Sequence, residues 1–349
     1  MMYVDVRNIK EIEIHIYVLG YYPIGESIFA VVWDKADKRV LKSVLFDCYE
    51  QKGTNKIFSL LNKYGLNDCK LDFVVWTHPD EDHSVGFEKL LTDYTSPRTI
   101  ALLPEGVTKK VFDLSWFGIK RYFTVRRKDN LFKHLIVERV SCSNNRTYPD
   151  EYGATRYKDG LGDDLKFSLE IATPFSYQVF QKTEVNKSFI KNDLSLSILL
   201  RFGEHCFYFG GDTTNQSLSE VEASRWQDVV FVKIPHHASK SSDKLPRILE
   251  DNIDFKSNGR ITAVSTSFEQ GTSHLPEEDV LEKYKTVSDS ILLTQDNIHA
   301  NNYGIWDCKY AVKPFVRLSP QPVGDASEWF IRPVRGKKKA LNKDDRARL

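Results

Sequence analysis

The sequence lacks several features that would assign it to a common class of protein. No apolar run in the 349 residues approaches the roughly 18 to 20 that a membrane-spanning helix needs. The five cysteines are scattered and form no CxxC pair, so they predict neither a disulfide framework nor a thiolate metal site. The first residues mix charges into apolar positions, as in a first strand and not in a signal peptide. We therefore expect a reduced, cytoplasmic protein without a membrane anchor.

Two catalytic motifs and a dominant sign of charge are also absent. The chain has no G-x-x-x-x-G-K-[ST] loop for nucleotide phosphates and no G-x-S-x-G elbow for a nucleophilic serine. Net charge is +1, but residues 335–349 hold seven Lys or Arg and two Asp, so this tail carries +5 and the rest carries −4. The tail is either a phosphate-attracting segment or an ordinary solvated terminus.

The pattern of apolar residues predicts an α/β fold. Alternating residues indicate strands at 12–18, 27–33 and 43–47, and helical spacing follows at 55–64. Further strands are predicted at 71–76, 167–173, 194–202, 205–212, 228–237, 261–267 and 290–295, with α/β character over 97–142 and helices near 87–91, 216–225 and 276–285. This order predicts a four-layer αββα sandwich over residues 1–320. We expect a polar, Tyr-bearing insertion near 143–166 and a C-terminal extension over 321–349.

Clusters of histidine and aspartate follow three of the predicted strands. His78, Asp80, Asp82 and His83 lie within six residues, directly after the apolar run 71–76. Imidazole and carboxylate together suit zinc, manganese or iron, and active sites concentrate at the carboxyl ends of strands in α/β proteins. Asp212 follows the strand and Gly-Gly pair at 207–211, where its carboxylate could bridge two metals.

A third cluster, His236 and His237, follows the apolar run 229–234. With this cluster the sequence resembles the metallo-β-lactamase superfamily, whose signature loop is HxHxDH. Within it, the chain resembles the DNA-processing domain of the ComEC competence channel family and its stand-alone relatives. The matching motifs appear in the family's order over about residues 10 to 300: Gly25-Glu26-Ser27, His78 to His83, Asn192-Asp193-Leu194-Ser195, Gly211-Asp212, His236-His237-Ala238-Ser239 and His274-Leu275-Pro276.

The resemblance implies one or two divalent metal ions, zinc or manganese, as the cofactor. The implied metal ligands are His78 and Asp80 for the first ion, Asp82 and His83 for the second, Asp212 as the bridge, and His237 (or its competitor His236) to complete the second site. Asp82 and Asp212 would be catalytic, with Asp82 orienting a metal-activated water.

This chain departs from the family at two positions. Asp80 stands where the family usually has histidine, and the third motif offers Asn192 or Asp193 in place of a histidine. The first site would then be poor in nitrogen, which favours manganese or a weakly held ion. His274 could contact substrate or pack in the core.

Residues that follow the two histidines could bind a phosphate group. Ser239 and Lys240 are the candidates, although both could be ordinary loop residues.

Three functions fit the sequence. The first is a metal-dependent phosphodiesterase or nuclease, for which the basic tail and the tyrosines Tyr148, Tyr152 and Tyr157 could bind nucleic acid. The second is a hydrolase of a small nucleotide or other phosphodiester, with residues 143–166 closing the pocket. The third is a binding or regulatory module whose weakened first metal site no longer supports turnover. A β-lactamase proper is not expected, because we see no export signal, and no protein partner is indicated.

Overall fold

The structure is a computed structural model of the chain. It describes residues 3–4, 11–51, 55–105, 135–142, 147–148, 156–158, 164–181, 191–254, 260–295, 303–312 and 315–329. None of the helices within these ranges has the length and apolar character needed to cross a membrane.

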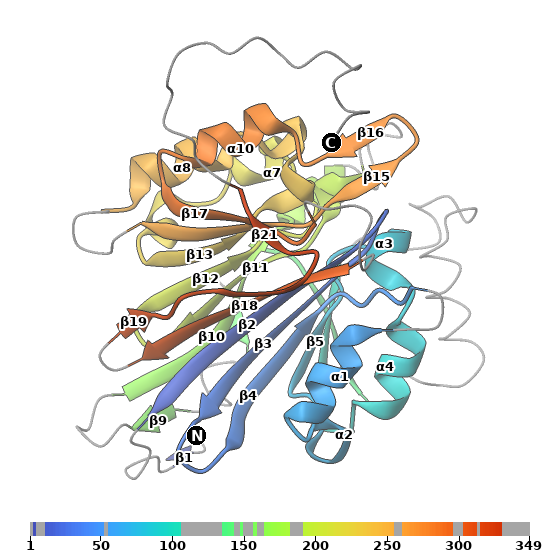
Figure 1. Cartoon of the computed structure of the whole chain (residues 1–349), viewed down its shortest axis with the longest axis vertical. Coiled ribbons are helices and arrows are strands. Elements are labelled where there is room, and N and C mark those ends of the chain that lie inside the picture. The colour runs from blue at the N-terminus through green and yellow to red at the C-terminus, as the bar shows by residue number, and fades with distance from the viewer. Residues whose placement is uncertain are drawn as a thin grey trace, which may run out of the picture.

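Two large β-sheets pack face to face at the centre of the molecule (Figure 1). The first sheet has the order β19-β18-β2-β3-β4-β5-β6-β7, with β20 beside β18. Its strands are β2 (Ile12–Tyr21), β3 (Glu26–Asp34), β4 (Arg39–Phe46), β5 (Phe73–Val75), β6 (Ile100–Pro104), β7 (Ile136–Val140), β18 (Tyr303–Val312), β19 (Phe315–Arg317) and β20 (Gln321–Gly324).

The second sheet has the order β1-β9-β10-β11-β12-β13-β14-β17-β21, with β8 beside β10. Its strands are β1 (Tyr3–Val4), β8 (Thr147–Tyr148), β9 (Arg156–Lys158), β10 (Asp164–Thr173), β11 (Ser197–Phe202), β12 (His205–Phe209), β13 (Val229–Lys233), β14 (Ile261–Ser265), β17 (Ser288–Leu293) and β21 (Ser327–Glu328). A separate hairpin consists of β15 (Phe268–Gln270) and β16 (Ser273–Leu275).

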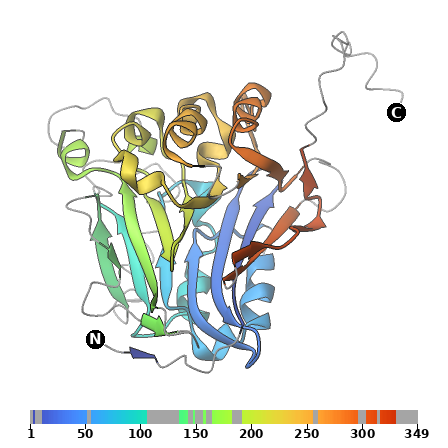
Figure 2. The same cartoon turned by 90° about the vertical axis from the view of Figure 1, so that its left-hand side faces the viewer.

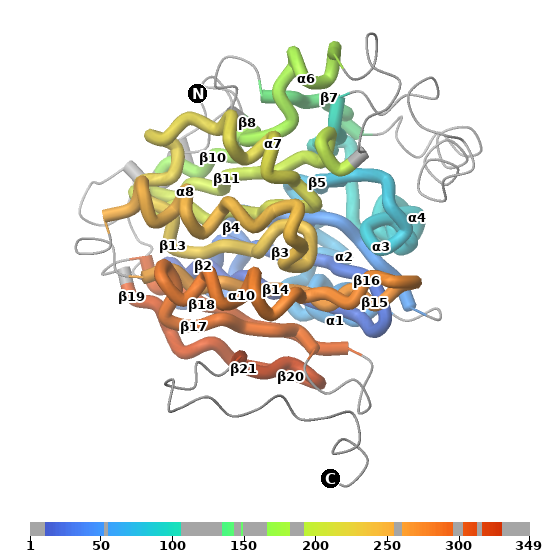
Figure 3. The backbone as a smooth tube through the Cα atoms, turned by 90° about the horizontal axis from the view of Figure 1, so that it is seen from above, coloured from blue at the N-terminus to red at the C-terminus, as the bar shows by residue number. Residues whose placement is uncertain are grey.

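Helices cover the outer face of each sheet, which completes four layers (Figures 1 and 2). On the first sheet these are α1 (Lys56–Lys63), α2 (Leu66–Cys69) and α4 (Phe87–Asp93). Seen from above, α8 and α10 run across the second sheet (Figure 3). The helices of this side are α7 (Asn215–Leu218), the 3₁₀ turn η4 (Ala223–Trp226), α8 (Leu245–Asn252) and α10 (Glu278–Tyr284), while α6 (Ser176–Phe180) follows β10. The predicted αββα sandwich is confirmed.

The layers are held together because the central strands bury apolar side chains on both faces of each sheet. Alternate residues of β2 point to opposite sides of the sheet. Ile14 and Ile16 join the core between the two sheets, whereas Tyr17 and Leu19 join the core beneath α1 and α4. The second sheet divides its residues in the same way, between the inter-sheet core and a third core under α8 and α10.

The sheet connections bring many strand ends to one edge of the sandwich. β4, β5 and β6 pair in parallel in the first sheet, and β12, β13 and β14 do so in the second. Carboxyl ends of parallel strands meet at the same edge, where ligands bind in α/β proteins. The three His/Asp clusters follow β5, β12 and β13 at this edge.

Some parts of the chain differ from the sequence-based expectation. The segment 143–166 contains β8, β9 and the start of β10, so it is partly built into the second sheet. Tyr148 is only 5% exposed, which makes its predicted role in base stacking wrong. Beyond residue 320, β20 pairs with β18 in the first sheet and β21 pairs with β17 in the second. Tyr152 and the basic tail lie outside the described residues, and so does the side chain of Tyr157.

Candidate metal centre

The first histidine cluster is fixed to the sheet by a buried aspartate. Asp47 directly follows β4, and its carboxylate accepts hydrogen bonds from the backbone N (2.7 Å) and hydroxyl (2.6 Å) of Thr77. These bonds hold the backbone next to His78, and the short helix α3 (Glu81–Ser84) then carries Asp82 and His83 inward. The loop therefore presents its ligand candidates from a rigid support.

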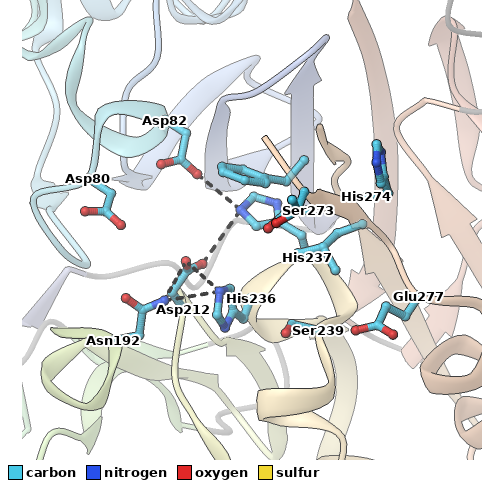
Figure 4. Close-up of a pocket in the computed structure, with 13 residues that line it drawn as sticks. Asp80, Asp82, Asn192, Asp212, His236, His237, Ser239, Ser273, His274 and Glu277 are labelled. Carbon is cyan, nitrogen blue, oxygen red and sulfur yellow. Dashed lines mark hydrogen bonds and ion pairs between the residues drawn. The ribbon is translucent and has the colours of Figure 1, made fainter. Parts of the chain in front are cut away.

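Asp212 lies at the centre of the site and has a different set of neighbours at each carboxylate oxygen. Its Oδ1 is 3.6 Å from Nε2 of His83 and 3.8 Å from Nε2 of His237. Both rings also face Oδ2 of Asp82, at 3.1 and 3.2 Å. This side brings together the four residues that the sequence assigned to the second metal ion and its bridge. Figure 4 shows three of them, Asp82, Asp212 and His237.

The other oxygen of Asp212 faces a second group. Its Oδ2 is 3.4 Å from Nε2 of His78, 3.6 Å from Nε2 of His236 and 3.3 Å from Nδ2 of Asn192. Asp80 lies beside this group, with Oδ2 3.6 Å from Nε2 of His78. The carboxylate of Asp212 thus stands between two clusters, as a bridging ligand must.

The side chains of the site are better arranged to bind a divalent cation than to hydrogen-bond with one another. Nε2 of both His78 and His83 is buried, and neither has a hydrogen-bond partner among the described residues. These two rings and Asp212 offer ligand atoms that all lie within 4.8 Å of one another. Imidazole nitrogen and carboxylate oxygen are the common ligands of zinc and its first-row neighbours. Their closest partners are carboxylates in ion-pair contact, at 3.4 Å from His78 to Asp212 and 3.1 Å from His83 to Asp82. Buried polar atoms without a well-aligned hydrogen bond are costly unless a ligand satisfies them.

Each histidine of the site is oriented through its other ring nitrogen. The partners of Nδ1 are Thr77 Oγ1 for His78 (3.0 Å), Asp47 Oδ2 for His83 (2.7 Å), Ser241 Oγ for His236 (2.6 Å) and Thr266 Oγ1 for His237 (2.8 Å). Such hydrogen bonds fix the ring and direct the opposite nitrogen toward a metal. All four rings therefore present Nε2 to the same centre.

A buried ion pair between Glu26 and Lys233 lies behind the histidines of the site. Glu26 and Lys233 are both fully buried, and Nζ of Lys233 donates to Oε2 of Glu26 at 2.8 Å. The same oxygen accepts a bond from Thr266, the residue that orients His237. Glu26 and the rings of His83 and His237 could also hold a cation between them by distance alone. Because Lys233 already neutralises Glu26, we assign Glu26 an orienting role.

Charge distribution explains the pKa values of the site. Burial would raise the pKa of Glu26, but Lys233 and the nearby imidazoles lower it to about 2. Burial lowers the pKa of His78, yet the carboxylate of Asp212 outweighs it and raises the value to about 9. His83 is raised well above its ordinary pKa, by Asp82 above all, against the effect of its own burial. The buried carboxylates thus favour positive charge beside them. Protonated His78 and His83 supply that charge when no metal ion is bound.

The structure separates the alternatives that the sequence left open. His237 lies on the Asp82 side, whereas His236 lies on the His78 side. Asn192 faces Asp212, but Asp193 turns away and accepts a hydrogen bond from the hydroxyl of Thr214.

Three further candidates lie around the pocket. His274 is 70% exposed at the rim, so it is not packed in the core. Ser239 lines the pocket. The Lys240 ammonium instead pairs with Glu277 (2.6 Å) and Asp279 (3.6 Å), and its side chain is not brought into the pocket lining.

The centre opens into a pocket of about 530 Å³. Its lining includes Asp80, Asp82, Asn192, Asp212, His236, His237 and Ser239 on one side, and Phe268, Thr272, Ser273, His274, Leu275 and Glu277 on the other. The β15–β16 hairpin and its turn form this second side except for Glu277, which precedes α10, and Figure 4 shows Ser273 and His274 there. The volume lies in the range of small-molecule sites.

Sequence reasoning missed the residues that support the ligands. In the sequence, Glu26 is visible only as part of the Gly25-Glu26-Ser27 motif, and Asp47, Thr266 and Lys233 belong to no motif. Asp47 and Thr266 lie at the carboxyl ends of the predicted strands 43–47 and 261–267, which is the signal that could have identified them. Glu26 is the first residue of β3 and Lys233 is the last residue of β13, and nothing in the local sequence distinguishes them.

Comparison with known proteins gives likenesses of fold. No family model matches the chain, and no curated protein matches it in sequence. Among solved structures, the metallo-beta-lactamase fold protein YhfI from Bacillus subtilis is similar with a TM-score of 0.43 and 11% identity, over 85% of this chain and 99% of that one. A diphosphatase from the PhnP family is similar with a TM-score of 0.38 and 13% identity, over 72% of this chain and 86% of that one. These likenesses assign no activity to this chain.

Proposed function

We propose that this chain is a metal-dependent hydrolase that cleaves phosphodiester bonds. The observation that carries the proposal is the convergence of four imidazole Nε2 atoms on the two oxygens of Asp212, with Asp80 and Asp82 alongside. A purely structural cluster would pair these polar atoms with one another. Here two of the ring nitrogens are buried without a hydrogen-bond partner in the described part of the chain.

The proposed chemistry is hydrolysis by a water molecule. When bound, divalent ions at this centre supply a nucleophilic water at neutral pH and neutralise charge on a phosphoryl oxygen. Asp212 holds the two halves of the centre together. Both ring contacts of Asp82 use Oδ2, and its side chain lines the pocket, where it would orient the water.

The charge of the pocket supports a diester as the substrate. Of the described residues that line it, four are carboxylates (Asp80, Asp82, Asp212 and Glu277) and none is Lys or Arg. An anion is therefore repelled unless metal ions are bound. A diester carries one negative charge, whereas a phosphate monoester carries about 1.5 to 2 near neutral pH. The diester thus meets less repulsion from the carboxylates Asp80, Asp82 and Asp212, whereas Glu277 is paired with Lys240.

The size of the pocket favours a small nucleotide or the end of a strand. A volume of about 530 Å³, enclosed on one side by the β15–β16 hairpin, suits a group of mononucleotide size. Cleavage within a long nucleic acid is the alternative. The support that Tyr148 offered to that alternative is lost, because the ring is buried.

The test is a metal analysis paired with an activity assay. Wild type, Asp212→Ala and the control Asp193→Asn would be purified and their bound metal determined by elemental analysis. Asp193 is a suitable control because it is also a buried carboxylate, in the same region, but it faces Thr214. Substrates are bis-p-nitrophenyl phosphate, a dinucleotide, and labelled single- and double-stranded DNA, each with zinc or manganese.

The expected result is metal-dependent cleavage by wild type and Asp193→Asn that is lost in Asp212→Ala. Preference for the dinucleotide over DNA would identify the small-nucleotide hydrolase. Bound metal without cleavage of any diester would contradict the proposed activity and leave a binding module. The absence of bound metal from the wild type would refute the metal centre itself.

A further inference from the structure

We propose that His236 is a ligand of the first metal ion and supplies the nitrogen that the third motif of this chain lacks. The inference rests on the proposed metal centre and concerns how its first half is completed. It differs from the arrangement implied by the resemblance, in which His236 only competes with His237 for the second ion.

The backbone at His236 has an unusual conformation. Three successive residues without glycine, His236, His237 and Ala238, have φ values of 49°, 50° and 61°. The left-handed region costs about 1–2 kcal/mol for each such residue. Strain of this kind persists where the surrounding structure enforces it, and it concentrates at functional sites.

The left-handed turn allows two adjacent imidazoles to face one centre. Neighbouring residues of an extended strand point to opposite faces, so β13 continued as a strand would direct only one histidine inward. The turn is held by bonds from the backbone N of His236 to the carbonyl of Gly211 (2.8 Å) and from the N of Ser239 to the carbonyl of His236 (2.9 Å). The first of these bonds ties the turn to the residue next to Asp212.

The contacts of the His236 ring place it on the first-metal side. Its Nδ1 pairs with Ser241, which leaves Nε2 facing Asp212 Oδ2 at 3.6 Å. Nε2 of His78 approaches the same oxygen at 3.4 Å. Nδ2 of Asn192 is 3.2 Å from Nε2 of His236 and 3.3 Å from that oxygen, so its amide NH₂ group can donate to either atom. His78, His236 and Asn192 therefore all approach the same oxygen of Asp212, and Asp80 adjoins them through His78.

This arrangement changes the expected metal chemistry of the site. With His236, the first ion has two imidazoles (His78 and His236), as the second has (His83 and His237), and both ions share Asp212. The first site is then no longer poor in nitrogen. Because imidazole suits zinc, we expect both sites to take zinc, where the sequence alone favoured manganese for the first.

The experiment compares His236→Ala with wild type, with His237→Ala as the partner variant and His205→Ala as the control. His205 lies at the start of β12, outside the pocket lining. Chelator-stripped protein is titrated with zinc, and stoichiometry and affinity are measured by competition with a chromophoric chelator. Manganese-loaded samples are examined by electron paramagnetic resonance, in which two ions sharing a carboxylate give a spin-coupled signal.

We expect two zinc ions for wild type and His205→Ala, and one for His236→Ala, with affinity for the other ion weakened by about 100-fold or more. The coupled manganese signal should give way to that of an isolated ion, while Asp82, His83 and His237 keep the second site. Two zinc ions in His236→Ala, with affinities within about threefold of wild type, would overturn the inference and leave the proposed function intact. Two ions in wild type without diester cleavage would contradict the proposed function alone.

Discussion

Replacing Lys233 by methionine tests whether the buried ion pair supports the metal centre. The ammonium of Lys233 is 2.8 Å from Glu26 and 3.0 Å from the carbonyl of Ile234, and its side chain is fully buried. At this distance and an effective dielectric constant of about 20, the attraction to Glu26 is about 6 kcal/mol. Methionine removes the free-energy cost of burying an ammonium group, but it leaves the Glu26 carboxylate buried without its counter-ion. We therefore expect the free energy of unfolding to fall by about 3–5 kcal/mol.

The matched control is Lys35→Met, since Lys35 pairs with Glu13 at a similar distance of 2.9 Å but is 55% exposed. Exposed pairs contribute about 0–1 kcal/mol. Urea unfolding of metal-stripped proteins, followed by circular dichroism, measures both effects. The loss of unfolding free energy in Lys233→Met should become smaller as the pH is lowered, because Glu26 can then take up a proton.

A second variant separates stability from orientation. Lys233→Met combined with Glu26→Gln removes both charges, so it should recover much of the lost stability. It should still bind zinc about 10–100-fold more weakly, because Thr266 and His237 lose the carboxylate behind them. A Lys233→Met deficit no larger than that of Lys35→Met would refute the reasoning, since it would mean that the buried carboxylate does not need its cation.

Three further predictions follow from the structure. Metal affinity should fall as pH is lowered, because metal binding displaces protons from His78, whose pKa is about 9, and from His83. Calorimetry in two buffers near pH 7 should detect the released protons. Metal binding without proton release would contradict the prediction. Gly211→Ala should destabilise the fold by roughly 1–3 kcal/mol and reduce bound metal, because φ is 50° and a Cβ would lie 2.8 Å from a hydroxyl oxygen. Gly65→Ala, at φ 70° with no atom within 4 Å, should lower the melting temperature less. Burial lowers the pKa of His15, so neutral His15 contributes to stability above its ordinary pKa of 6.5, and this contribution is lost as the pH falls further. Wild type should therefore lose more stability than His15→Gln between about pH 7 and pH 5. Equal losses would show that His15 does not contribute to the pH dependence.

The sequence by itself determined the layers of the fold and most of the candidate centre. Alternating apolar residues identified β2, β3 and β4 because a strand repeats every two residues, and this signal is local. Likewise, the His/Asp clusters are recognisable because ligand-rich loops directly follow apolar runs. His78, Asp82, His83, Asp212 and His237 were named on that basis, and the structure brings their side chains together.

Features set by distant pairing were not readable from the sequence. β18 joins the first sheet beside β2, almost 300 residues earlier in the chain. Glu26 and Lys233 are paired across the two sheets, and no local pattern marks a lysine inside an apolar strand as buried.

Backbone conformation decided the remaining assignments. Asn192 and Asp193 are equivalent as letters, but the 3₁₀ turn η3 (Lys191–Leu194) points one at Asp212 and the other at Thr214. His236 and His237 both face the centre only because the chain turns left-handed after β13. Sequence specified which chemical groups reach the edge of the sandwich; tertiary contacts fixed the dihedral angles and, with them, the oxygen of Asp212 that each group faces.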